Sequence, residues 1–175
     1  MWSVRAIRVD PAPHCGVPER MTPQPLSAVV DLLDRDLAAM AVLVETLPEP
    51  LLWEPRPGVI NPVGTLALHV SGNLRHFVGA VLGGDGYVRD RVAEFERRDA
   101  TRDQVLSELG QARDAVAAAL ARLDAQRLEQ PMPSPPPLFE GRSIAYFLIQ
   151  LCTHLAWHLG QADYLARMLR AEAEG

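Results

Sequence analysis

The sequence predicts an all-α protein built as a four-helix bundle. Four long segments carry apolar residues at spacings of three and four, which would place those residues on one face of a helix. The segments between them are rich in proline, glycine and charged residues, which interrupt helices. No segment alternates clearly enough to indicate a sheet. With 175 residues, the chain is long enough for one domain with a sizeable core.

The first predicted helix begins at or just after Thr22 and ends near Leu47. Threonine is a good helix cap, and Pro23 and Pro25 fit a first turn, where no backbone N–H is needed. Residues 48–62 contain five prolines, so we expect a structured connection there without a helix. The apolar face of the first helix is predicted to be Leu26, Val30, Leu33, Leu37, Met40, Val44 and Leu47.

The second predicted helix has Asn61 as its cap and Pro62 in its first position, and it ends at the glycine pair that begins at Gly83. His69 falls on its apolar side. Residues 83–100 then form a charged connection that is longer than a turn between antiparallel neighbours requires. We therefore expect a long crossover between the second and third helices.

The third predicted helix starts with a capping box, in which Thr101 caps the helix and Gln104 reaches back, and it ends near Arg127. Residues 130–140 contain five prolines and are expected to be irregular. The last helix follows Gly141. Its apolar positions are predicted to be Ile144, Leu148, Leu151, Leu155, Ala162, Leu165 and Leu169.

The composition narrows the class of partner and the compartment. A net charge of -5 gives no reason to bind nucleic acid or an anionic membrane surface, which leaves small molecules as the expected partners. The two cysteines, Cys15 and Cys152, form no disulfide framework, and no apolar run reaches the roughly 18 residues of a membrane span. A reducing cytoplasm fits both observations. Residues 1–21 contain three prolines and no lasting period, so we expect an N-terminal extension outside the core.

Three histidines are candidates for a metal site. His154 and His158 are four residues apart in the last helix, so their imidazoles point the same way, and His69 lies on the buried side of the second helix. Inward side chains from facing helices are how bundles build metal sites, and three imidazoles leave a coordination position for water or substrate. The alternative is that all three are core histidines held by hydrogen bonds. The zinc-protease pattern HExxH is absent, because no glutamate follows His154.

Three stretches of the sequence resemble the DinB/YfiT-like superfamily of metalloenzymes. They are TLALHVSGNLRHFVGAVLGG from Thr65, GYVRDRVAEF from Gly86 and HLAWHLGQADYL from His154. The resemblance covers about residues 22–170 and implies a bundle over residues 22–172 with up-down-down-up topology. It also implies that a histidine of the second helix and the HxxxHxGQ motif of the fourth bind a divalent metal, which corresponds to His69, His154 and His158.

The resemblance implies a class of chemistry without a defined substrate. Some members of the superfamily are thiol-dependent transferases or isomerases, so a thiol S-transferase or a hydrolase of small molecules is expected, with a low-molecular-weight thiol as one candidate partner. The alternative is a non-catalytic bundle that binds metal or ligand in a structural or interaction role. Imidazole suits zinc and nickel, which we expect first, and iron. A homodimer is left open.

Further residues are candidates for the surroundings of the metal. Asn73, His76 and Gln161 are candidates for a second shell or a pocket, and each is at least as well explained by a structural hydrogen bond. The charged residues between Arg89 and Glu94 favour an ion-pair network that holds the crossover. Trp53 and Trp157 are expected to be packing aromatics. We expect the open metal position to face a pocket bordered by residues 48–62 and by the crossover, residues 83–100.

Overall fold

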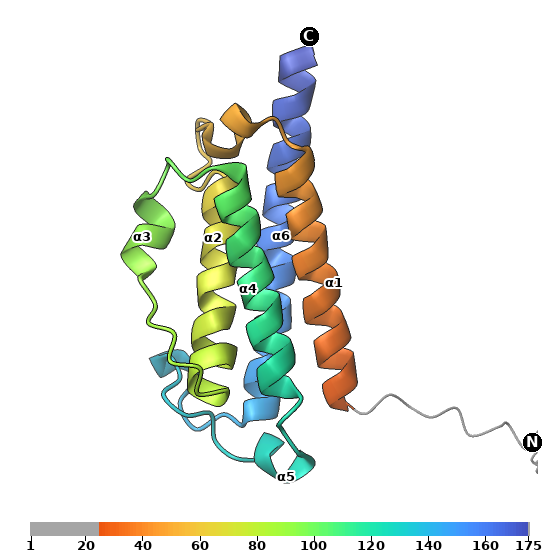
Figure 1. Ribbon diagram of the computed structural model, residues 1–175, viewed down its shortest axis with the longest axis vertical. Coiled ribbons are helices and arrows are strands. Elements are labelled where there is room, and N and C mark those ends of the chain that lie inside the picture. The colour runs from red at the N-terminus through yellow and green to blue at the C-terminus, as the bar shows by residue number, and fades with distance from the viewer. Residues whose placement is uncertain (1–24, 175) are drawn as a thin grey trace, which may run out of the picture.

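The structure is a computed structural model that describes residues 25–174, so the predicted extension at residues 1–21 lies outside the described part. The all-α class is confirmed, because the described residues contain no strand, only two isolated bridges. Four longer helical segments run side by side: α1 (Pro25–Thr46), α2 (Val63–Leu74) continued by η2 (Arg75–Leu82), α4 (Arg102–Leu120) and α6 (Ile144–Glu174) (Figure 1).

The directions of these helices can be followed in Figure 1. α1 and α6 run upward in that view, and α2 and α4 run downward. α1 packs against α4 and α6, and α2 also packs against α4 and α6. α2 and α4 are therefore parallel neighbours, which explains why the chain needs a long connection between them. This connection passes along the outer side of α2.

The predicted apolar faces form the core. All seven apolar positions predicted in the last helix are buried, and each is at most 3% exposed. In the first helix, the five positions from Leu33 to Leu47 are buried as well, while Leu26 and Val30 are partly buried at its start. The apolar spacing therefore identified the inward face of these helices correctly, and in α6 this face carries His154 and His158.

Three expectations about these segments were wrong, and the crossover contains a helix that was not predicted. Residues 48–62 contain a short 3-10 helix, η1 (Glu49–Trp53), because a 3-10 turn tolerates proline in its first positions. The cap of α2 is Pro62 and not Asn61. The crossover contains a short helix, α3 (Arg91–Glu96), which Asp90 caps. A further 3-10 turn, η3 (Pro137–Phe139), interrupts the proline-rich segment before α6.

Two helices also differ from the expected regular form. Helix α2 was expected to continue regularly to Gly83, but its last two turns, η2, are π-helical, with the Gly83 N–H donating to Val78 O, five residues before, at 2.9 Å. The third helix was expected to reach Arg127. It ends at Leu120, and a separate turn, α5 (Ala125–Leu128), begins where Asp124 accepts a hydrogen bond from the Arg127 N–H. The capping box at Thr101 is confirmed.

The two tryptophans behave differently. Trp53 packs against the core as expected, and its indole N–H donates to Ala100 O at 3.0 Å, which ties the first connection to the end of the crossover. Its ring lies over Gly64, where a Cβ atom would come within 2.7 Å of the ring. Trp157 is not a packing residue, because it is 70% exposed on α6.

Candidate metal centre

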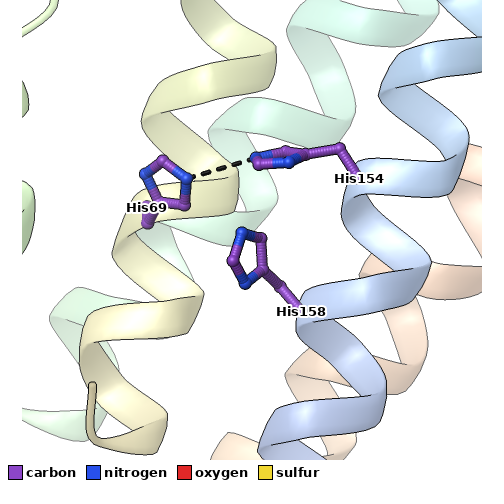
Figure 2. A group of neighbouring side chains, drawn as sticks. All are labelled: His69, His154 and His158. Atoms are coloured by element: carbon purple, nitrogen blue, oxygen red, sulfur yellow. Dashed lines mark hydrogen bonds between the residues drawn. The ribbon is translucent and has the colours of Figure 1, made fainter. Parts of the chain in front are cut away.

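Three imidazoles converge between α2 and α6. His69 comes from α2, and His154 and His158 come from successive turns of α6, so that all three rings meet in the space between the two helices (Figure 2). One potential ligand atom from each residue lies within 4.8 Å of the other two. The structure therefore brings together the three histidines that the sequence singled out.

The three rings lie edge to face and are not stacked, so each can offer a nitrogen to a shared metal ion. The Nε2 atoms of His69 and His154 lie 3.2 Å apart, the interaction drawn in Figure 2. The ring of His158 stands at 90° to each of the other two rings, with centroids 5.0 Å from His69 and 4.5 Å from His154. Two nitrogens bound tetrahedrally to one zinc ion would be about 3.3 Å apart, given Zn–N distances near 2.05 Å. The spacing of His69 and His154 is close to that value.

The site favours the uncharged form of the two imidazoles of α6 near neutral pH. Burial, together with the neighbouring rings of His158 and His69, lowers the pKa of His154 to about 4. Burial also lowers the pKa of His158, although its hydrogen bond to Gln161 opposes that shift. Neutral imidazole is the form that binds metal, so the surroundings favour the ligand form.

Glu94 of α3 holds His69 from the side of the crossover. Its Oε2 atom lies 3.0 Å from His69 Nδ1, and both residues are buried. Arg89 binds the same carboxylate twice, through Nε at 2.7 Å and Nη2 at 2.8 Å. Burial raises the pKa of Glu94, but the hydrogen bonds from Arg89 and His69 outweigh it, so the pKa lies below its ordinary value and the group is a carboxylate. A carboxylate can only accept, which makes Nδ1 of His69 the donor and leaves Nε2 free for a metal.

Glycine at position 72 makes this contact possible. Gly72 follows His69 by three residues on α2, and a Cβ atom there would lie 2.1 Å from Glu94 Oε1 and 2.7 Å from its Cδ. The missing side chain therefore lets the carboxylate approach the helix backbone closely. Phe95 lies beside Glu94 and packs its ring 4.8 Å from that of His69. α3 thus covers His69 with one acidic and one aromatic side chain.

Sequence reasoning underestimated this part of the site. The Arg89–Glu94 ion pair was expected as a loop-holding network, and the pair is present. The contact from Glu94 to His69 was not anticipated, nor was the tilted ring contact between Phe95 and His69. The remaining charges of the segment have local roles, because Asp90 caps α3 and the Arg91 guanidinium lies 4.9 Å from the Phe95 ring. The signal available was the acidic and aromatic pair in the stretch GYVRDRVAEF, which also carries the family resemblance.

Among the candidates for surrounding residues, Gln161 contacts the site directly. Its Oε1 atom lies 2.8 Å from His158 Nδ1, so the amide oxygen accepts from Nδ1 and leaves Nε2 of His158 free. Asn73 is half-buried with its Oδ1 atom unpaired among the described residues, and His76 packs against Phe77 at 4.6 Å. Neither belongs to the cluster of ligand atoms. Cys152 also stays outside the cluster, and burial raises the pKa of its thiol.

A cavity of about 560 Å³ lies next to the histidines, on the side where α2 begins. Its walls come from residues 58–61 of the first connection, from Leu66 of α2 and from α6, including Gln161. The first connection therefore borders a pocket beside the site, as expected. The crossover does not line this cavity, which corrects the expected second border, because its residues line a separate, smaller depression and cover His69 instead.

Comparison with known proteins shows which family the chain belongs to. A search of curated proteins found no significant match. The profile of the DinB superfamily, in contrast, matches residues 32–162, which include α2, the crossover, α4 and all three histidines of the site. The match covers most of the chain and agrees with its helical fold and with the motifs around His69 and His154. The chain therefore belongs to the DinB superfamily.

Proposed function

We propose that this protein is a metal-dependent enzyme of the DinB superfamily that binds a divalent ion through His69, His154 and His158. The observation that carries the proposal is the convergence of three imidazoles within 4.8 Å, from two different helices. Zinc or nickel are the expected ions, with iron as the alternative, because imidazole suits all three metals.

The hydrogen bonds around the cluster support metal binding over a structural role. Nδ1 of His69 and Nδ1 of His158 each have an acceptor, Glu94 and Gln161 respectively, so that both rings present Nε2 to the common centre. Outer partners of this kind fix the tautomer and the orientation of a metal-binding imidazole. The hydrogen bond between Nε2 of His69 and Nε2 of His154, at 3.2 Å, would by itself hold these two rings together, but it does not account for the approach of the third ring, that of His158.

The chemistry follows from a site with three neutral ligands. A bound divalent ion would lower the pKa of a water or a thiol toward neutrality and so supply a nucleophile for a small-molecule substrate. In this chain, Glu94 and Gln161 hold the imidazoles in position, and α3 shields His69 from solvent. We therefore propose hydrolysis or thiol S-transfer, with a low-molecular-weight thiol as one candidate partner. A non-catalytic, metal-binding or ligand-binding bundle with a structural or interaction role is the alternative.

The fold proposal is the up-down-down-up four-helix bundle, with α3 and α5 as additions to its connections. The directions of the four longer helical segments in Figure 1 support this description. None of the helices in residues 25–174 is long and apolar enough to span a bilayer. The bundle boundaries at residues 22 and 172, cytoplasmic localisation and a homodimer stay predictions.

Metal analysis of the untagged protein, purified without added metal, tests the proposed function. We expect close to one divalent ion per chain, and we expect His158→Ala to lose it. His76→Ala is the matched control, because His76 lies in η2, the continuation of α2, and outside the ligand cluster, so this variant should keep its metal. Metal-free wild-type protein that also fails to bind added zinc, nickel or iron would refute the proposal.

A further inference from the structure

The cavity beside the histidines, here called the α6 cavity, is positioned to receive a substrate. Gln161 connects the two, because its side chain lines the cavity and its Oε1 atom lies 2.8 Å from His158 Nδ1. Leu66 and Leu165 line the same cavity, and they lie on the turns that lead from His69 and His158 toward the start of α2. A molecule in the α6 cavity would therefore have one end beside the metal ligands.

The size and lining of the cavity indicate what it can hold. About 560 Å³ is typical of pockets that bind small molecules. None of the described side chains that line it carries a charge, and its polar side chains are the neutral groups of Asn61, Gln161 and Tyr164. The other large side chains of the wall are aliphatic or thioether groups, such as Val59, Ile60 and Met168.

We propose that the α6 cavity binds the uncharged, largely apolar body of the substrate, with the reacting group directed toward the histidines. This inference rests on the proposed function and narrows its substrate class. The cavity is open to solvent, since Ile60 and Tyr164 of its wall are 89% and 63% exposed, so a carboxylate or phosphate there would lose part of its hydration and would find no cation among the described lining residues. An anionic group of the substrate would therefore have to lie at the metal, and a thiol that carries several carboxylates is a poorer fit than a neutral substrate.

A matched pair of fluorescent probes tests the ligand class. N-phenyl-1-naphthylamine is neutral, and 1-anilinonaphthalene-8-sulfonate has the same ring system with one negative charge. Metal-free protein at pH 8 is used, so that neither a metal ion nor protonated histidines attract the anion. We expect the neutral probe to bind at least about ten times more tightly, because the apolar wall offers the sulfonate no cation. Equal binding, or tighter binding of the anion, would overturn the inference.

A pair of lysine variants locates the binding. Met168 and Ile149 are both exposed apolar residues of α6, at 38% and 59%, but only Met168 lines the cavity. Met168→Lys should weaken binding of the neutral probe at least about fivefold and improve binding of the anionic probe, since it adds a cation to the wall. Ile149→Lys adds the same net charge elsewhere and should change neither affinity. Equal responses of the two variants would show that the probes bind outside the cavity.

Metal titrations on the same preparations separate this inference from the proposed function. Metal binding without selective binding of the neutral probe would overturn the cavity inference and leave the metal proposal standing. Selective probe binding that responds to Met168→Lys, in a protein that binds no metal, would support the ligand class and overturn the proposed function. Both variants should retain the metal affinity of the wild type, because neither position contacts the three histidines.

Discussion

Replacing Gly72 with alanine should damage the metal site without altering any ligand. A Cβ atom at this position would lie 2.1 Å from Glu94 Oε1, whereas unbonded carbon and oxygen atoms rarely approach below 3 Å. The Glu94 carboxylate would have to move by about 1 Å to restore an ordinary contact. Glutamate can make that movement, because the clashing atom is the end of a flexible side chain. The movement would, however, take the carboxylate away from His69 Nδ1, now 3.0 Å distant.

Two opposing effects determine how much Gly72→Ala changes the free energy of unfolding. Alanine in place of glycine inside a helix stabilises by about 1 kcal/mol. A hydrogen bond to a charged group contributes about 1.5–3 kcal/mol, and part of that would be lost in a buried site. We therefore expect the metal-free protein to lose up to about 2 kcal/mol of its free energy of unfolding. Metal affinity should fall about 10–100-fold, which is typical when the outer partner of a metal-binding histidine is removed.

The assay compares two glycines. Gly110 is a helical glycine of α4 that is exposed, unlike the buried Gly72, and a Cβ atom there would meet nothing within 4 Å. Gly110→Ala should raise the free energy of unfolding by up to about 1 kcal/mol and leave metal affinity unchanged. Urea denaturation of the metal-free proteins and calorimetric metal titrations provide the two readouts. If Gly72→Ala were stabilised like Gly110→Ala and bound metal like the wild type, the role assigned to Glu94 would be refuted.

A second variant tests whether Gly72 acts through Glu94. Glu94→Gln retains the side-chain length but removes the charge that Arg89 and His69 bind, so it should weaken metal binding to a similar extent. The double variant should lose little more than either single variant, because both changes break the same contact between Glu94 and His69. Additive losses in metal affinity would mean that Gly72→Ala acts by another route.

The other predictions concern the free energy of unfolding. In the metal-free protein, stability should fall as the pH drops from about 7 toward 4, since the unfolded chain takes up a proton near pH 6.5 and folded His154 only near pH 4. Chemical denaturation across this range should show a shallower dependence in His154→Gln, and parallel curves would contradict the assignment. Gly64→Ala should destabilise by about 1–3 kcal/mol, because the new methyl group overlaps the Trp53 ring, and an unchanged urea midpoint would disprove that contact. Arg102→Met should cost about 1–2 kcal/mol, because the guanidinium donates to two carbonyls at the end of α1, at 3.2 and 2.8 Å. A matched loss in Arg98→Met, whose guanidinium donates to the carbonyls of Phe95 and Arg97 in its own segment, would indicate a general charge effect instead.

The helices and the three histidines could be predicted from the sequence because their signals are local. The apolar spacing around His154 and His158 fixes which side of α6 is buried, and the buried positions agree with it. The same spacing in α2 places His69 inward. Because the apolar faces of α2 and α6 pack against each other, the histidines on these faces are brought close together. The capping box at Thr101 could also be predicted, because it is defined by two residues three positions apart in the sequence.

The parts that escaped prediction depend on contacts between distant segments. α3 is six residues long, too short for a clear period, and it is stable because it packs on α2. The end of α4 at Leu120 also followed no apolar signal, since Leu123 continues the pattern beyond it. Helix α4 ends there because Asp124 caps the start of α5, and this cap competes with further turns of α4.

Glu94 shows why the spacing of the ligands in the sequence predicts only part of a metal site. In the sequence it is one acid within a charged loop, where exposure and surface ion pairs are the default expectation. It is buried because three features coincide: Arg89 neutralises it, His69 gives it a donor, and Gly72 leaves space against α2. Each of the three is ordinary in isolation. Because α3 supplies Glu94 and the first connection helps to form the α6 cavity, the segments that seemed to be connections complete the surroundings of ligands that the long helices provide.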